Sequence, residues 1–180
     1  YALEDGSYTN QILNINKSYN FVNPKAGISY HNGGHKGYLS MAYASREPER
    51  NNFTDNGKYP APNAEHLFDV ELGYQYTGNN WYAGTNFYYM GYKDQFVQTG
   101  EQSDIGENLT TNVKDSYRMG AELSAGWNAT SWFTLEGNAA LSINKIKDFN
   151  EFVDNWDNKK NPLKVHYDNS TLAFSPSAIL

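Results

Sequence analysis

The sequence predicts an all-β fold: an antiparallel up-and-down meander of about seven strands that forms part of a transmembrane β-barrel. Three observations predict it. Apolar and polar residues alternate with a period of two over long stretches, and no helical period accompanies them. Short Gly- and Asn-rich turns alternate with long polar segments. A Tyr or Trp brackets each short turn.

Composition narrows the classes of protein that fit these 180 residues. A net charge of −6 disfavours nucleic-acid binding, which needs a basic face. The absence of Cys excludes disulfides and thiolate chemistry. Aromatic residues make up 16% of the chain, which argues against disorder. The mean hydropathy is −0.75, and no run approaches the ~20 apolar residues of a membrane helix.

The clearest strands are predicted over 68–76, 117–127 and 133–143. Their length matches the ~9–11 residues with which a tilted strand crosses a bilayer. One face of each is apolar and the other is polar. We expect the apolar set to face lipid: Val70, Leu72, Met119, Leu123, Leu135 and Leu141. We expect the polar set to line the lumen: Asp69, Glu71, Arg118, Glu122 and Glu136.

Four weaker strands complete the meander, over 21–30, 37–45, 81–92 and 171–180. The stretch 81–92 is apolar on both faces, so its sides stay unassigned. Over 171–180, Leu172, Phe174, Ala178 and Leu180 share one side.

The connections alternate between short and long. The short turns are His31–Lys36, Thr77–Asn80 and Asn128–Ser131. The expected long loops cover 46–65, 94–114 and 147–168. Outer-membrane barrels have this asymmetry, with short periplasmic turns and long extracellular loops.

Aromatic residues flank all three short turns: Tyr30 and Tyr38, Tyr76 and Trp81, and Trp127 and Trp132. Such a row is typical of the aromatic girdle at a membrane interface. Tyr and Trp also close hairpins in soluble sheets. The polar residues on the opposite strand faces favour the membrane.

Five stretches, in order and at matching spacing, resemble the barrel strands of TonB-dependent outer-membrane receptors. They run from about Phe21 to the end of the chain. These stretches are Phe21–Tyr30 with Asn23-Pro24, Tyr38–Pro48 with its Arg46-Glu47-Pro48 exit, Glu65–Tyr74, Tyr88–Gln95 followed by Asn112–Glu122, and Phe174-Ser175-Pro176. The iron-complex branch of the family is the nearest match.

The resemblance implies a barrel of about 22 strands closed by an N-terminal plug domain. It implies a place in outer-membrane lipid, import of a bulky metal chelate such as a ferric siderophore or haem, and energy from the TonB complex acting through the plug. The chain starts at Tyr1 and stops within an apolar alternation at Ala178–Leu180. We therefore expect 1–180 to be a segment of one barrel domain, without the plug and the remaining strands.

Ligand-binding candidates lie in the expected long loops. Phe152, Trp156 and Tyr167 offer aromatic contact area in 147–168, while Arg46 and Arg50 offer positive charge to an anionic chelate. Packing between loops explains the aromatic residues equally well, and Glu47 and Glu49 offset the arginines. The lumen-lining charges serve a substrate path or contacts to the plug, although a lumen is polar in any case.

The sequence carries no signature of an enzyme or of a resident cofactor or metal. Phosphate-binding loops, zinc-protease motifs and nucleophile elbows do not occur. His66 and His166 stand at loop–strand junctions, where an imidazole can ligate haem iron, but a solvated loop His is the commoner case. Two alternatives to an active importer stay open: a passive porin or adhesin barrel, and a soluble aromatic β module that binds carbohydrate.

Overall fold

The structure, a computed structural model, describes residues 15–54, 60–102, 106, 108–153, 163–172 and 176–179. Eight strands and one short helix follow one another along the chain. They are β1 (Lys25–Asn32), β2 (His35–Arg46), α1 (Arg50–Thr54), β3 (Glu65–Thr77), β4 (Trp81–Gln102), β5 (Asn108–Asn128), β6 (Thr134–Val153), β7 (Leu163–Thr171) and β8 (Ala178–Ile179).

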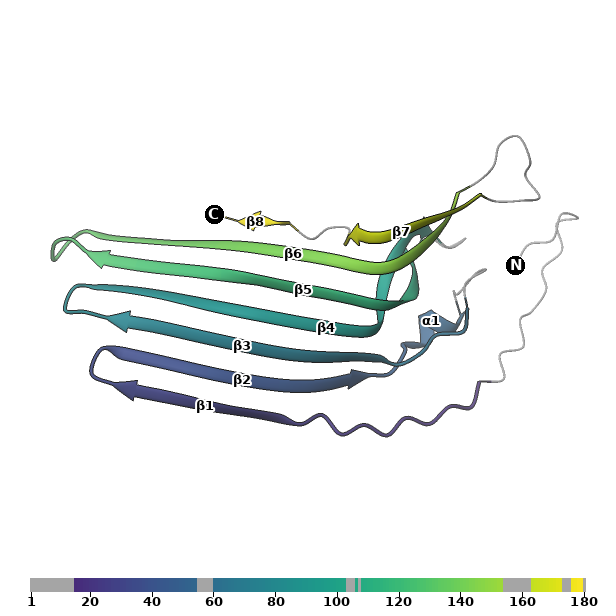
Figure 1. Cartoon of the computed structure of the whole chain (residues 1–180), viewed down its shortest axis with the longest axis horizontal. Coiled ribbons are helices and arrows are strands. Elements are labelled where there is room, and N and C mark those ends of the chain that lie inside the picture. The colour runs from purple at the N-terminus through teal and green to yellow at the C-terminus, as the bar shows by residue number, and fades with distance from the viewer. Residues whose placement is uncertain are drawn as a thin grey trace, which may run out of the picture.

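The strands form one antiparallel sheet in which β1 to β7 pair in sequence order. Figure 1 shows them side by side, with the short turns at one end and α1 and the long connections at the other. The sheet does not close on itself. The predicted meander is confirmed, and α1, with five residues, is the single helix among the described residues. No helix of the described part is long and apolar enough to span a membrane.

The structure differs from the expected elements at two long loops and at the last strand. Most of 94–114 and much of 147–168 continue the strands, so β4 and β5 have 22 and 21 residues. These extensions stand above the apolar band, where no lipid-facing surface imposes an alternation of apolar and polar residues. The expected strand over 171–180 is not continuous: Leu172, Pro176 and Ser177 lie outside any strand, and 173–175 and 180 lie outside the described residues. Its described strand residues belong to the end of β7 and to β8, and both pair with β6.

The sheet bends where its polar extensions begin. Asp94 in β4 and Asp148 in β6 adopt positive φ values of 51° and 55°, a conformation that L-residues rarely hold within a strand. Beyond this level, the β4–β5 hairpin turns away from the plane of the other strands (Figure 1). Val113, Ile146 and Leu172 meet there in a small buried core. The core therefore lies at the long-loop end, outside the flat part of the sheet.

Candidate functional site

The strand register separates the sheet into two chemically different faces. Directly paired residues share a face, and Leu39, Leu72 and Phe87 form one transverse row. We call this apolar side the outer face and the opposite side the inner face. The outer face includes all six residues expected to face lipid: Val70, Leu72, Met119, Leu123, Leu135 and Leu141.

Large apolar side chains of the outer face are exposed in this segment. Leu72, Leu123 and Leu141 keep 55%, 51% and 58% of their surface. A soluble monomer rarely exposes a contiguous apolar patch beyond a few hundred Å². This face therefore needs a nonaqueous surrounding.

Aromatic side chains bound the apolar band at both ends. Trp81 and Trp127 pair at the short-turn end, and Tyr89 stacks with Tyr117 toward the other end, with ring centroids 6.4 Å apart. Tyr117 and Trp127 are ten residues apart on β5. At ~3.3 Å per residue and a tilt of ~40°, the band is about 25 Å tall. That height matches the apolar band of outer-membrane barrels.

Charged residues of the outer face begin at the level of Tyr117, whose direct partner on β6 is Lys145. Lys93, Asp115 and Lys147 form one row across β4, β5 and β6. Lys93 forms an ion pair with Asp115, and the Lys147 ammonium lies 5.3 Å from the centre of the Tyr117 ring. Charge therefore returns where the apolar band ends, as expected at a bilayer surface.

One member of the expected girdle is wrong. Tyr38 lies on the inner face, in a row with Gly73 and Asn86, and its hydroxyl donates to Asn86 Oδ1 at 3.0 Å. Tyr38 flanks the first turn in the sequence. It is one residue from Gly37, the partner of Tyr30, so its side chain points to the other face of the sheet. Tyr30, Tyr76, Trp81 and Trp127 share the outer face, and Trp132 lies in the third turn with 84% of its surface exposed.

The inner face carries the five charged residues that the sequence pattern predicts to line the lumen. Asp69, Glu71, Arg118, Glu122 and Glu136 all fall on this side of the register. One row forms a polar chain: Tyr38 bonds Asn86, and Asn86 Nδ2 lies 3.4 Å from Glu122 Oε2. This chain runs from β2 past Gly73 of β3 to β4 and β5, and it links three strands through side chains.

Three tyrosines of the inner face lie flat over glycines of the neighbouring strand. The pairs are Tyr38 with Gly73, Tyr82 with Gly126, and Tyr88 with Gly120. A Cβ on Gly73 would lie 2.8 Å from Cδ1 of Tyr38 and closer still to Cε1. Only glycine fits beneath each ring, which is why glycines interrupt these strands.

One atom in each of two charged groups of the inner face lacks a hydrogen-bond partner among the described residues. Asp69 Oδ1 and Arg118 Nε are both buried and unpaired. They share one row, with Met90 between them. The Arg118 guanidinium lies 5.7 Å from the centre of the Tyr92 ring. An unpaired buried polar atom is costly, so this row holds unsatisfied polar atoms within the wall.

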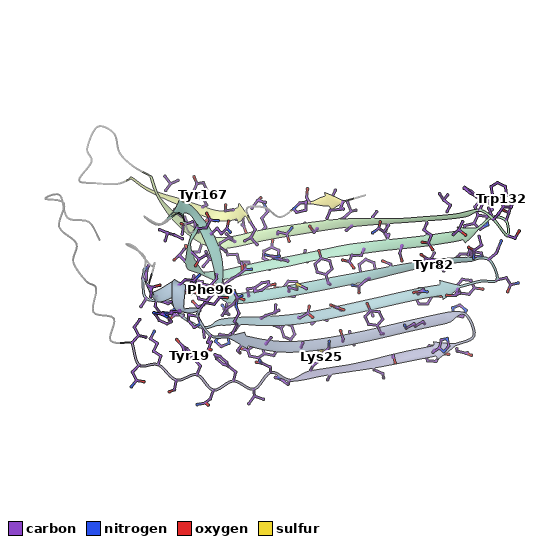
Figure 2. All side chains as sticks on the ribbon, turned by 180° about the vertical axis from the view of Figure 1, so that it is seen from behind. Tyr19, Lys25, Tyr82, Phe96, Trp132 and Tyr167 are labelled. Carbon is purple, nitrogen blue, oxygen red and sulfur yellow. The ribbon has the colours of Figure 1, made fainter. Side chains whose placement is uncertain are left out.

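The ligand-binding candidates lie at the long-loop end but not together. Arg46, in β2, pairs with Glu65 at 3.2 Å and covers the Phe96 ring at 5.6 Å. Tyr167, in β7, stacks on Phe149 at 6.4 Å. Strands β2 and β7 are five positions apart, about 24 Å along the sheet at ~4.8 Å per strand. Figure 2 shows Tyr167 at the end opposite Trp132.

The other candidates are only partly described. Arg50 begins α1 and is exposed. Phe152 lies in β6, but its side chain falls outside the described residues, as does all of Trp156. His66 Nδ1 lies 2.8 Å from Ser45 Oγ, and His166 lies between Asp148 and Asp168 at 3.5 and 3.0 Å. Among the described residues, no group of three or more His, Asp or Glu side chains is placed so that it could hold a metal ion.

Sequence reasoning missed the contacts that hold the inner face together. The Tyr–Gly pairs and the Tyr38–Asn86–Glu122 chain depend on register, which no single strand reveals. The available signal was a glycine on the polar face of a predicted strand, at Gly73 in β3 and at Gly120 and Gly126 in β5.

Comparisons with known proteins agree with this architecture. The model of the TonB dependent receptor-like β-barrel family matches residues 3–176. The chain is similar to a solved copper transporter, OprC, with 21% identity and a TM-score of 0.55 over 68% of this chain and 20% of that one. It is also similar to the FrpB iron transporter from Neisseria meningitidis (F3-3 variant), with 21% identity and a TM-score of 0.54 over 70% of this chain and 20% of that one.

The chain thus spans about a fifth of the length of these two solved structures. The search among curated proteins gives no match. The family match covers nearly the whole chain and agrees with the apolar band, the girdles and the polar inner face. The chain belongs to the TonB-dependent receptor-like β-barrel family, whose place is the outer membrane of Gram-negative bacteria.

Proposed function

We propose that this chain is a wall segment of an active outer-membrane importer that takes up a scarce, bulky metal complex with energy from the TonB complex. The observation that carries the proposal is a wall with a lipid-compatible outer face and a polar, partly unsatisfied inner face, in a chain of this family. The two similar structures are a copper and an iron transporter, which supports a metal-containing substrate.

The unpaired groups of the inner face support contact with a plug domain. Asp69 Oδ1 and Arg118 Nε have opposite charges and lie within one row. A plug with complementary polar groups would pair with the exposed atoms of these two side chains, and such contacts would hold it in the lumen until energy input moves it. The plug therefore gives the charges of the inner face a polar partner.

The long-loop end is the proposed site of substrate capture. Arg50 is an exposed cation there, and Tyr167 presents an aromatic ring beside Phe149. Arg46 already pairs with Glu65, so its role is to fix the exit of β2 rather than to hold ligand. Phe152 and Trp156 belong, with Tyr167, to the segment 147–168, and they stay candidates for contact with the substrate. Arg50 follows β2 and Tyr167 lies in β7, and this separation fits a bulky ligand better than a single ion.

Uptake by cells that carry the full-length receptor tests the proposal. Iron-starved cells with and without the receptor are given a radioactive ferric siderophore, haem or copper salt, each with and without a protonophore. An active importer accumulates one substrate, and the protonophore or loss of TonB abolishes that accumulation. Accumulation that is unchanged by the protonophore and by loss of TonB would show a passive pore.

Alanine substitutions separate capture from packing. Tyr167→Ala and Trp156→Ala should each weaken binding of the imported substrate about threefold to tenfold, because a stacked aromatic contact contributes roughly 0.5–1.5 kcal/mol. Trp132→Ala, at the opposite end, is the matched control and should leave affinity unchanged. Unchanged affinity in all three, with lowered melting for Tyr167→Ala, would assign the loop to packing.

A further inference from the structure

The outer face is hollowed at one place near the short-turn end. A cavity of about 420 Å³ lies across β1 to β4, between Tyr30 and Tyr74 and against Leu39, Leu72 and Phe87. Its cause is local: Tyr30, Gly37 and Tyr74 form one transverse row, and Gly37 has no side chain to fill the space between the two rings. The result is an apolar slot with aromatic walls.

The end of the slot nearest the turn is polar. His35 lies on the outer face, and its Nδ1 is 2.7 Å from the Tyr74 hydroxyl. The β1–β2 turn, 31–36, also carries His31 and Lys36 on its inner side and contains no acidic residue. The other two short turns, 77–80 and 128–131, contain no ionisable side chain. The apolar slot therefore ends beside the turn 31–36, which is the basic one of the three short turns.

We propose that this slot binds one phospholipid, with an acyl chain along Gly37 and the phosphate at the His35–Tyr74 end. The slot is continuous with the apolar band that the family turns toward the bilayer, so a lipid chain reaches it without crossing water. The basic turn favours an anionic headgroup, since a cation near the surface contributes to holding anionic lipid. The inference is independent of the proposed transport.

Filling the slot tests the acyl-chain contact. A Cβ at Gly37 meets only the Gly73 carbonyl oxygen, at 3.9 Å, so Gly37→Leu projects into the cavity without a clash. Gly137→Leu is the matched control, because Gly137 is also on the outer face, has nothing within 4 Å and lies in β6, outside the slot. Both variants add the same side chain to a lipid-facing strand.

Native mass spectrometry of the full-length receptor in maltoside micelles measures retention of added phosphatidylglycerol. A buried methylene contributes about a fourfold factor, so displacing about two methylenes should weaken retention about fifteenfold in Gly37→Leu. Gly137→Leu should behave as wild type. Equal retention by all three proteins would overturn the proposal. Loss of a receptor dimer in Gly37→Leu would instead assign the slot to a second copy.

A second experiment tests recognition of the phosphate by comparing two lipids that have identical acyl chains and different headgroups. Wild type should retain phosphatidylglycerol at least about fivefold better than uncharged diacylglycerol, and His35→Ala should narrow that difference, since His35 is the polar group on the same face as the slot. Inorganic phosphate alone should not compete. Equal retention of the two lipids would overturn phosphate recognition, and competition by free phosphate would show an anion site rather than a lipid site.

Discussion

The Tyr–Gly pairs of the inner face predict an unusual penalty for a single methyl group. Gly73→Ala places a Cβ against the Tyr38 ring, which must move away and give up its bond to Asn86. The lost hydrogen bond costs about 0.5–1.5 kcal/mol and the overpacking about 1–3 kcal/mol. The gain from replacing glycine in a strand is only about 0.5–1 kcal/mol. We expect a net destabilisation of about 2 kcal/mol.

Guanidinium unfolding of the full-length receptor in lipid vesicles measures this effect, with Gly137→Ala as the control. A Cβ at Gly137 meets nothing within 4 Å, so this variant should be neutral or more stable by up to about 1 kcal/mol. Tyr38→Ala should remove the penalty of Gly73→Ala in the double variant, because the clash disappears with the ring. Equal stability of the two glycine variants would refute the packing of Tyr38 over Gly73.

Three further substitutions test the faces and the small core by the same unfolding measurement. Leu123→Arg should cost about 2–4 kcal/mol on the lipid side, and Glu122→Arg, one residue away, should cost much less; equal costs would contradict the assignment of faces. Lys93→Ala, unfolded with urea because guanidinium chloride is itself a salt, should cost under about 1 kcal/mol, and less in added salt, because its pair with Asp115 is exposed. Ile146→Ala should cost about 2 kcal/mol through loss of buried contacts at the long-loop end, where its side chain is 5% exposed; no change would show that this core is not needed.

The sequence was a good guide wherever one face must meet lipid. The alternation in 68–76 and 117–127 predicts the faces of Val70, Glu71 and Arg118, because a charge at mid-membrane is excluded from the lipid side. Lipid on one side of the sheet therefore requires apolar and polar residues to alternate along each strand. The same physics fails above the bilayer: 94–102 and 108–114 form a hairpin whose two faces both tolerate polar residues.

Contacts between strands were the part that sequence could not supply. Tyr38 was expected in a girdle, yet its parity within β2 places it over Gly73 on the inner face. The unpaired Asp69 and Arg118 look like ordinary lumen charges until the register puts them in one row with Met90 between them. Such relations depend on which residues of separate strands are opposite each other, and a one-residue slip would change all of them.

The central claim, that one face of this sheet meets lipid and the other the barrel interior, is tested most directly at neighbouring residues of β3. The chain has no Cys, so single cysteines at positions 71 and 72 of the full-length receptor can carry spin labels, with any cysteine outside this segment first replaced. Oxygen dissolved in lipid should relax the label at Leu72, and a water-soluble nickel chelate should act more strongly at Glu71. Equal responses at the two positions, or the reverse order, would contradict the account.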